Sequence, residues 1–183
     1  MQYRFSLYHT IATLGAILTL VMAIFLGGGG GFISLPGILF TMGLTFFLLL
    51  GNFKGDFLRF IPDSIRTLFM TPSAPVPQYA EIAKYGARYV VGSGALGTII
   101  GVVQMLMGMT DPATIGQGIA VGLLTIFYAL LASELFFAFQ YRVYLGPHSP
   151  AAPLSLASTG IAVVITVVIV IVVAIAVIGF WSI

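Results

Sequence analysis

Five long apolar runs govern what this chain can fold into, because charged residues are nearly absent from each of them. Their lengths lie near or above the roughly 17–25 residues that an α-helix needs to cross a bilayer. The sequence therefore predicts an all-α fold, a polytopic membrane helix bundle of about five transmembrane helices. The runs extend over about Ile11 to Leu26, Phe32 to Leu50, Tyr89 to Met109, Ile115 to Phe139 and Leu156 to Trp181.

The composition excludes several classes of function. Charged residues make up 7% of the chain, whereas soluble domains carry about a quarter, so membrane lipid is the expected surroundings. The seven Lys and Arg residues are too few for a nucleic-acid surface. Cysteine is absent and the histidines, His9 and His148, lie far apart, so no metal site is expected. No catalytic motif is present, and we expect neither an enzyme nor a cofactor.

The runs divide the chain into four parts. Residues 1–50 form an N-terminal transmembrane hairpin that turns at Gly27–Gly31. Residues 51–87 form the one wet segment, with an amphipathic helix over about Lys54 to Met70 and a proline-rich loop. Residues 88–145 form a second hairpin, and residues 146–183 a proline-rich linker and a fifth span. The wet segment is either a connector with a solvated face or a surface that docks a partner.

The basic residues predict an orientation. With five spans, Arg4, the segment from Lys54 to Arg88, and Arg142 all fall on one side of the membrane. Cytoplasmic loops carry the excess of Lys and Arg. The N-terminus is therefore expected in the cytoplasm and the C-terminus on the opposite side, which is the periplasm of a bacterial inner membrane.

Small residues recur at helical spacing in the third and fourth runs. Such stripes allow helix backbones to approach closely within a membrane, and the plain interpretation is tight packing inside one bundle. We expect these two spans to be the inner pair. The third run carries Ser93, Gly94, Gly97, Thr98 and Gly101, and the fourth carries Gly118, Gly122, Thr125 and Ala129.

Two motifs resemble a known family. The segment from Gly94 to Gly101 is similar to the Gly-x-x-Gly-Thr-x-x-Gly pattern in the third span of the MotA/TolQ/ExbB proton-channel family. The segment from Gly118 to Leu131 is similar to the fourth span of its MotA branch, and Asp111-Pro112 resembles the turn before that span. The resemblance implies a homopentameric ring around a single-span partner of the MotB/TolR/ExbD type, which carries a membrane Asp. Proton flow past that Asp would drive the partner's movement.

The resemblance also implies residues on the ion pathway. Thr98 matches the family's third-span threonine, and Thr125 stands first where the MotA-type pattern has two threonines. Ile126 takes the second place and removes a hydroxyl. Glu134 falls where the branch tends to have Asn, and it either extends the cytoplasmic exit or pairs with a base such as Arg142 or with a neighbouring subunit.

Two departures from the family leave other functions open. The loop from Gly51 to Arg88 is much shorter than the rotor-contacting domain of flagellar MotA proteins, and the fifth span is additional. Together with Ile126, these features favour the first alternative, a non-conducting membrane scaffold with the same fold. The second alternative is a small transporter component.

Overall fold

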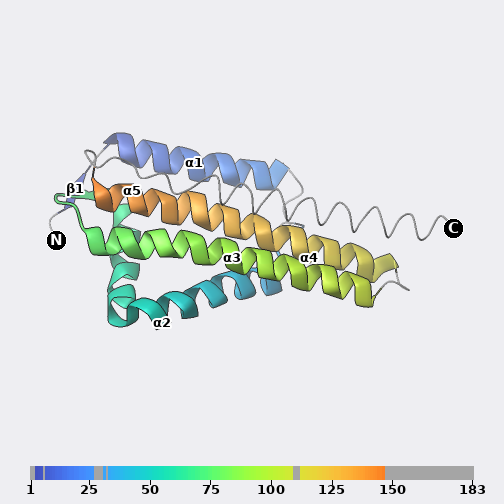
Figure 1. Ribbon diagram of the computed structural model, residues 1–183. Helices are drawn as coiled ribbons and strands as arrows, with labels where there is room; N and C mark the ends of the chain where they lie inside the picture. The colour runs from blue at the N-terminus through green and yellow to red at the C-terminus, as the bar shows by residue number, and fades with distance from the viewer. Residues whose placement is uncertain (1–2, 6, 27–30, 32, 109–111, 147–183) are drawn as a thin grey trace.

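The computed structural model describes residues 3–5, 7–26, 31, 33–108 and 112–146, and within them the chain is a bundle of long helices (Figure 1). The last three helical segments follow one another without a break and form one rod. The elements are β1 (Tyr3–Phe5), α1 (Leu7–Leu26), α2 (Leu35–Thr67), β2 (Met70–Pro72), α3 (Pro77–Met107), α4 (Pro112–Leu131), the π-helical segment η2 (Ala132–Ala138) and α5 (Phe139–Leu145).

The predicted polytopic helical membrane protein is confirmed over the described residues. Three helical stretches are long and apolar enough to cross a membrane: Leu35–Thr67, Pro77–Met107 and Ile115–Leu145. The first expected span is a helix, α1, but its apolar stretch Leu14–Leu26 is shorter than these. The expected fifth span and most of the glycine turn lie outside the described residues, so the total of five spans stays a prediction.

Helix α2 continues past the expected end of the second span. Charged residues begin after Leu50, yet charge does not stop a helix, and α2 runs on to Thr67 with a kink at Lys54. Lys54 has φ 48° and ψ −121°, which lies outside the regions that residues with a side chain ordinarily adopt. After the kink, α2 turns across one end of the bundle (Figure 1).

The strained backbone at Lys54 gives a first testable expectation. Glycine adopts a positive φ without the steric cost of a Cβ, so Lys54→Gly should raise the free energy of unfolding in detergent by about 1 kcal/mol. Lys54→Ala removes the charge but keeps the Cβ, and it should leave stability unchanged. An equal gain in both variants would show that the charge, and not the backbone, is responsible.

A short antiparallel ribbon of two three-residue strands accompanies the helices. β1 pairs with β2, with Arg4 opposite Thr71 and Phe5 opposite Met70. The amphipathic helix was expected to reach Met70, but it ends at Thr67 and Met70 lies in the strand. The partner strand lies at the far N-terminal end of the sequence, so no local pattern near Met70 predicts this pairing.

The proline-rich loop ends where α3 begins, at Pro77. Proline suits the first turn of a helix, where its fixed φ is already helical and its missing N–H has no intrahelical acceptor. Val76 before it, at φ −124° and ψ 82°, lies outside the α region, which a residue preceding proline avoids. Its N–H donates to the carbonyl oxygen of Tyr144 at 2.8 Å, which ties the start of α3 to the end of α5.

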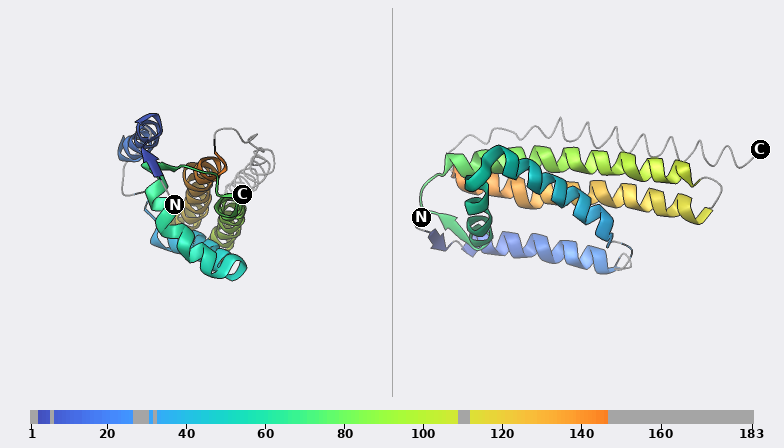
Figure 2. Two further views of the ribbon diagram at one scale, coloured as in Figure 1. Left: turned by 90° about the vertical axis from the view of Figure 1, so that its left-hand side faces the viewer. Right: turned by 90° about the horizontal axis from the view of Figure 1, so that it is seen from below.

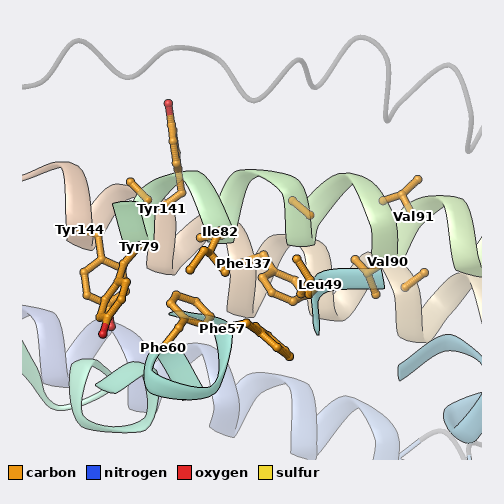
Figure 3. Packing of buried hydrophobic residues seen from close by; sticks show 14 residues of the cluster. Leu49, Phe57, Phe60, Tyr79, Ile82, Val90, Val91, Phe137, Tyr141 and Tyr144 are labelled. Carbon is orange, nitrogen blue, oxygen red and sulfur yellow. The ribbon is translucent and has the colours of Figure 1, made fainter. Parts of the chain in front are cut away.

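The hydrophobic core gathers around the kinked part of α2 (Figure 3). Phe60 from that part is fully buried, and its ring centroid lies 5.7 Å from that of Tyr79 on α3 and 5.8 Å from that of Tyr144 on α5. Such aromatic pairs add to the burial of apolar area. One face of the expected amphipathic helix is therefore part of the bundle core, while Leu58 and Ile65 on another face remain exposed.

The segments that carry the basic residues meet at one end of the bundle. β1, the second part of α2, the start of α3 and α5 all lie there, opposite the end of α3 (Figures 1 and 2). This arrangement agrees with the grouping that the positive-inside rule needs. The direction of the termini across a membrane stays a prediction.

Candidate functional site

Helices α3 and α4 touch through their backbones. A Cβ added to Gly101 would lie 2.8 Å from the carbonyl oxygen of Gly118 and 2.7 Å from the amide nitrogen of Gly122. A Cβ added to Gly94 would lie 2.3 Å from the Cβ of Ala129. These separations are below any that real Cβ atoms show, so glycine is required there. Most of the predicted small residues thus form one seam between α3 and α4.

Two threonines meet at this seam. The Thr98 hydroxyl lies 3.0 Å from the carbonyl oxygens of both Gly94 and Gly122, and its residue is 2% exposed. The Thr125 hydroxyl donates to the carbonyl oxygen of Val121 and lies 3.2 Å from that of Gly122. The structure therefore brings both threonines to one acceptor, the Gly122 carbonyl, and each hydroxyl has a backbone partner within its own chain.

Ser93 does not join that seam but faces α2. Its hydroxyl donates to the carbonyl oxygen of Tyr89 at 2.8 Å and accepts from the Thr45 hydroxyl at 3.2 Å. The hydroxyl of Thr41, one turn earlier on α2, is buried without a hydrogen-bond partner. Sequence reasoning missed this layer, although the four-residue spacing of the two threonines within an apolar run was a usable signal.

Gly97 lies at the junction of three helices. A Cβ there would lie 2.5 Å from Cγ2 of Thr125 on α4 and 3.1 Å from Cδ1 of Phe40 on α2. Its missing side chain lets α2 and α4 approach the same turn of α3. The stripe predicted on α3 therefore serves two neighbouring helices.

Glu134 lies apart from the threonines. It is exposed within η2, roughly 13 Å along the rod from Thr125 at 1.5 Å per residue. Ile126, which stands where a second threonine was expected, is 5% exposed, and its Cα lies 3.5 Å from the Cβ position of Gly94. The structure thus brings together two of the three predicted pathway residues, Thr98 and Thr125. The position of the missing hydroxyl is occupied by the buried apolar side chain of Ile126.

A second buried polar cluster links the kinked part of α2 to α5. Gln140 is fully buried; its Nε2 donates to the carbonyl oxygen of Ser64 at 2.8 Å, and its Oε1 accepts from the Thr67 hydroxyl at 2.5 Å. Sequence reasoning missed this cluster. A lone glutamine among aromatic residues late in the fourth span was the available signal, because a buried amide needs partners.

The site offers few kinds of chemical group. The α3–α4 seam offers hydroxyl and carbonyl groups, which can donate, accept and hand on a hydrogen bond. Within the described residues no three His, Cys, Asp or Glu side chains come together in a way that could hold a metal ion. The seam therefore fits close packing and hydrogen-bonded contacts.

Comparison with known proteins finds similarity over the hairpin. Residues 71–147 match the MotA/TolQ/ExbB proton channel family, a range that contains all of α3, α4, η2 and α5. The chain is 42% identical over 43 residues to Motility protein A of Aquifex aeolicus (strain VF5) and 49% identical over 45 residues to Motility protein A of Cereibacter sphaeroides. It is 46% identical over 53 residues to Chemotaxis protein PomA of Vibrio alginolyticus.

These similarities are local. They cover 24%, 25% and 28% of this chain and 17%, 18% and 21% of the three relatives. The family is one of proton channels and not of enzymes. Over the α3–α5 hairpin, therefore, this chain is similar to the MotA/TolQ/ExbB proton channel family, and within it to MotA-like proteins.

Proposed function

We propose that this protein is the ring subunit of a proton-driven motor in the bacterial inner membrane. Copies of the chain, five in the ring, surround a single-span partner of the MotB/TolR/ExbD type and couple ion flow to its movement. The supporting observation is that the family match coincides with the hairpin whose seam gathers Thr98 and Thr125 around one carbonyl.

The distribution of acids supports a division of labour between two chains. In the described part of the spans that follow the loop, the acids are Glu81, near the start of α3, and Glu134. Neither lies beside the threonine pair. Since ionisable groups in membranes are costly and usually mark ion pathways, the carboxylate that takes up protons at mid-membrane comes from the partner.

Thr98 and Thr125 line the path of the proton in this proposal. The two acceptors of the Thr98 hydroxyl lie at the same distance, so a small rotation exchanges one hydrogen bond for the other. A hydroxyl that can donate and accept suits a relay. Gly94, Gly97, Gly101, Gly118, Gly122 and Ala129 hold the two helices close enough for this contact.

One observation favours a second candidate, a non-conducting scaffold with the same fold. Ile126 is buried beside Gly94 where the MotA-type pattern has a threonine. An apolar side chain there removes a hydrogen-bonding step from the seam. The two candidates differ in whether protons cross.

The test combines imaging with proton flux. The full chain would be purified with the single-span, Asp-bearing protein encoded beside it, imaged by cryo-electron microscopy and reconstituted into liposomes. We expect a ring whose centre is lined by α3 and α4. Thr98→Ala should lower partner-dependent proton flux by about tenfold or more, while Thr98→Ser should preserve it.

Thr45→Val is the matched control, because it removes a buried hydroxyl from the α2–α3 contact instead of the seam. It should leave flux unchanged. A ring that forms but gives no flux in the unaltered protein would favour the scaffold. A monomer would overturn both candidates.

A further inference from the structure

Two opposite charges are exposed at the edge of apolar helix surfaces. Arg88 is exposed on α3 and Glu134 on η2. On the α3 surface that follows Arg88, Leu96 and Ile99 are exposed, and Leu123 and Leu135 are exposed on the α4–η2 rod. A membrane protein that leaves charges on such a surface needs something other than lipid to cover them.

The two charges lie at the same height along the bundle. The Ser133 hydroxyl donates to the carbonyl oxygen of Ala87 at 3.5 Å. Glu134 directly follows Ser133 in the sequence, and Arg88 directly follows Ala87. The Phe137 ring covers Gly86 in the same layer. Within a membrane, copies of one chain share one orientation and depth, so a neighbouring copy presents its Arg88 at the depth of Glu134.

Within the described part of the chain, neither Arg88 nor Glu134 forms a salt bridge. The Arg88 guanidinium carbon lies 6.0 Å from the centre of the Tyr85 ring, on its own helix. No salt bridge joins Glu134 to a base among the described residues, where the ion pair formed is that of Arg66 with Asp63 at 3.6 Å. Arg142 follows roughly 12 Å further along the rod, beyond the reach of Glu134.

We propose that a second copy of this chain covers this surface, and that Arg88 of one copy pairs with Glu134 of the next. The pairing rests on the proposed ring and supplies its side-to-side contact. It joins different surfaces of the two copies, and such a head-to-tail contact closes into a ring when its rotation allows. Guanidinium and carboxylate groups form the strongest of the common ion pairs, with two parallel hydrogen bonds.

The position of Glu134 in a π-helical turn suits a contact with a neighbouring copy. A π-helix accommodates an additional residue and changes the direction of the side chains around it, and such turns are frequent at functional sites. Glu134 lies within η2, and the neighbouring Ser133 faces α3 inside the same chain. The π-helical turn therefore contacts α3 through Ser133, while Glu134 is exposed on the surface of the same turn.

Cross-linking tests the pair directly, because the sequence has no cysteine of its own. Arg88→Cys and Glu134→Cys would be introduced into separate, differently tagged chains that are co-expressed in membranes. A bis-methanethiosulfonate reagent is used because a disulfide would demand a closer approach than an Arg–Glu pair provides. We expect a product that carries both tags. Leu96→Cys combined with Glu134→Cys, at a different depth, should give no such product.

Charge reversal supplies an independent readout. Arg88→Glu and Glu134→Arg should each lower the oligomeric fraction in detergent by at least about tenfold, and the double reversal should restore it. Helix content by circular dichroism should be the same in all three variants. An oligomer that tolerates each single reversal would overturn the pair.

The outcomes separate this proposal from the proposed function. A ring that forms without the two-tag product overturns the Arg88–Glu134 contact and leaves the motor proposal standing. An unaltered chain that stays monomeric in detergent and in lipid nanodiscs overturns both.

Discussion

Gly101→Ala should destabilise the protein by about 3 kcal/mol, near the upper end of the effect of overpacking a core. The added Cβ would lie 2.8 Å or less from backbone atoms of Gly118 and Gly122. Backbone atoms in the middle of a helix cannot move aside as the end of a flexible side chain can. The helices must separate, and the Thr98 hydroxyl, 3.0 Å from the Gly122 carbonyl oxygen, then loses that acceptor.

Two glycines of α4 provide matched controls. A Cβ on Gly122 would lie 3.4 Å from the nearest atom, the Thr98 carbonyl oxygen, and a Cβ on Gly116 would have no atom within 4 Å. Unfolding by sodium dodecyl sulfate in mixed micelles should therefore rank Gly101→Ala as strongly destabilised, Gly122→Ala as mildly affected and Gly116→Ala as unaffected. Equal effects at all three positions would argue against a backbone contact at Gly101.

The seam between α3 and α4 was predictable from the sequence, because helical periodicity places the small residues on one face of each helix. Gly94, Thr98 and Gly101 fall on one face of α3, and Gly118, Gly122 and Thr125 on one face of α4. Two such faces on consecutive antiparallel spans are expected to pack against each other. What periodicity does not fix is the register between the helices. The sequence therefore predicted that the threonines lie inside the bundle, but not that both meet the Gly122 carbonyl.

The remaining structure depends on contacts distant in the sequence. The kink at Lys54, with φ 48°, has no proline directly beside it, and it lies between Phe53 and Phe57, which both pack in the core. The Thr67–Gln140 hydrogen bond and the β1–β2 pairing join segments far apart in the chain. Local propensity carries no information about such partners.

The π-helical segment was equally hidden from sequence reasoning, and one of its residues makes a close contact with α3. A Cβ on Gly86 would lie 2.3 Å from Cε1 and 2.4 Å from Cδ1 of Phe137. The ring thus occupies the space that a side chain on α3 would fill. Phe137 belongs to η2, so this close contact secures the π-helical part of the rod against α3.

Gly86→Ala should therefore be the second strongly destabilising change, with a cost of about 2–3 kcal/mol from overpacking. Its methyl group would displace the Phe137 ring, which is 7% exposed and packed in the core. Phe137→Leu alone should cost about 1 kcal/mol through lost apolar contact. Unfolding of detergent-solubilised protein, followed by circular dichroism, measures both.

The double variant Gly86→Ala/Phe137→Leu decides whether the two residues act as one unit. Leucine lacks the Cε and Cζ atoms of the ring and can rotate its Cδ methyl groups away from the new methyl group, so the double variant should be more stable than Gly86→Ala alone. Residues in direct contact give coupling energies of about 0.5–3 kcal/mol in such cycles. Strictly additive effects would mean that the ring does not fill the space above Gly86. Gly92→Ala, on the same helix with no atom within 4 Å of the added Cβ, should show no coupling to Phe137.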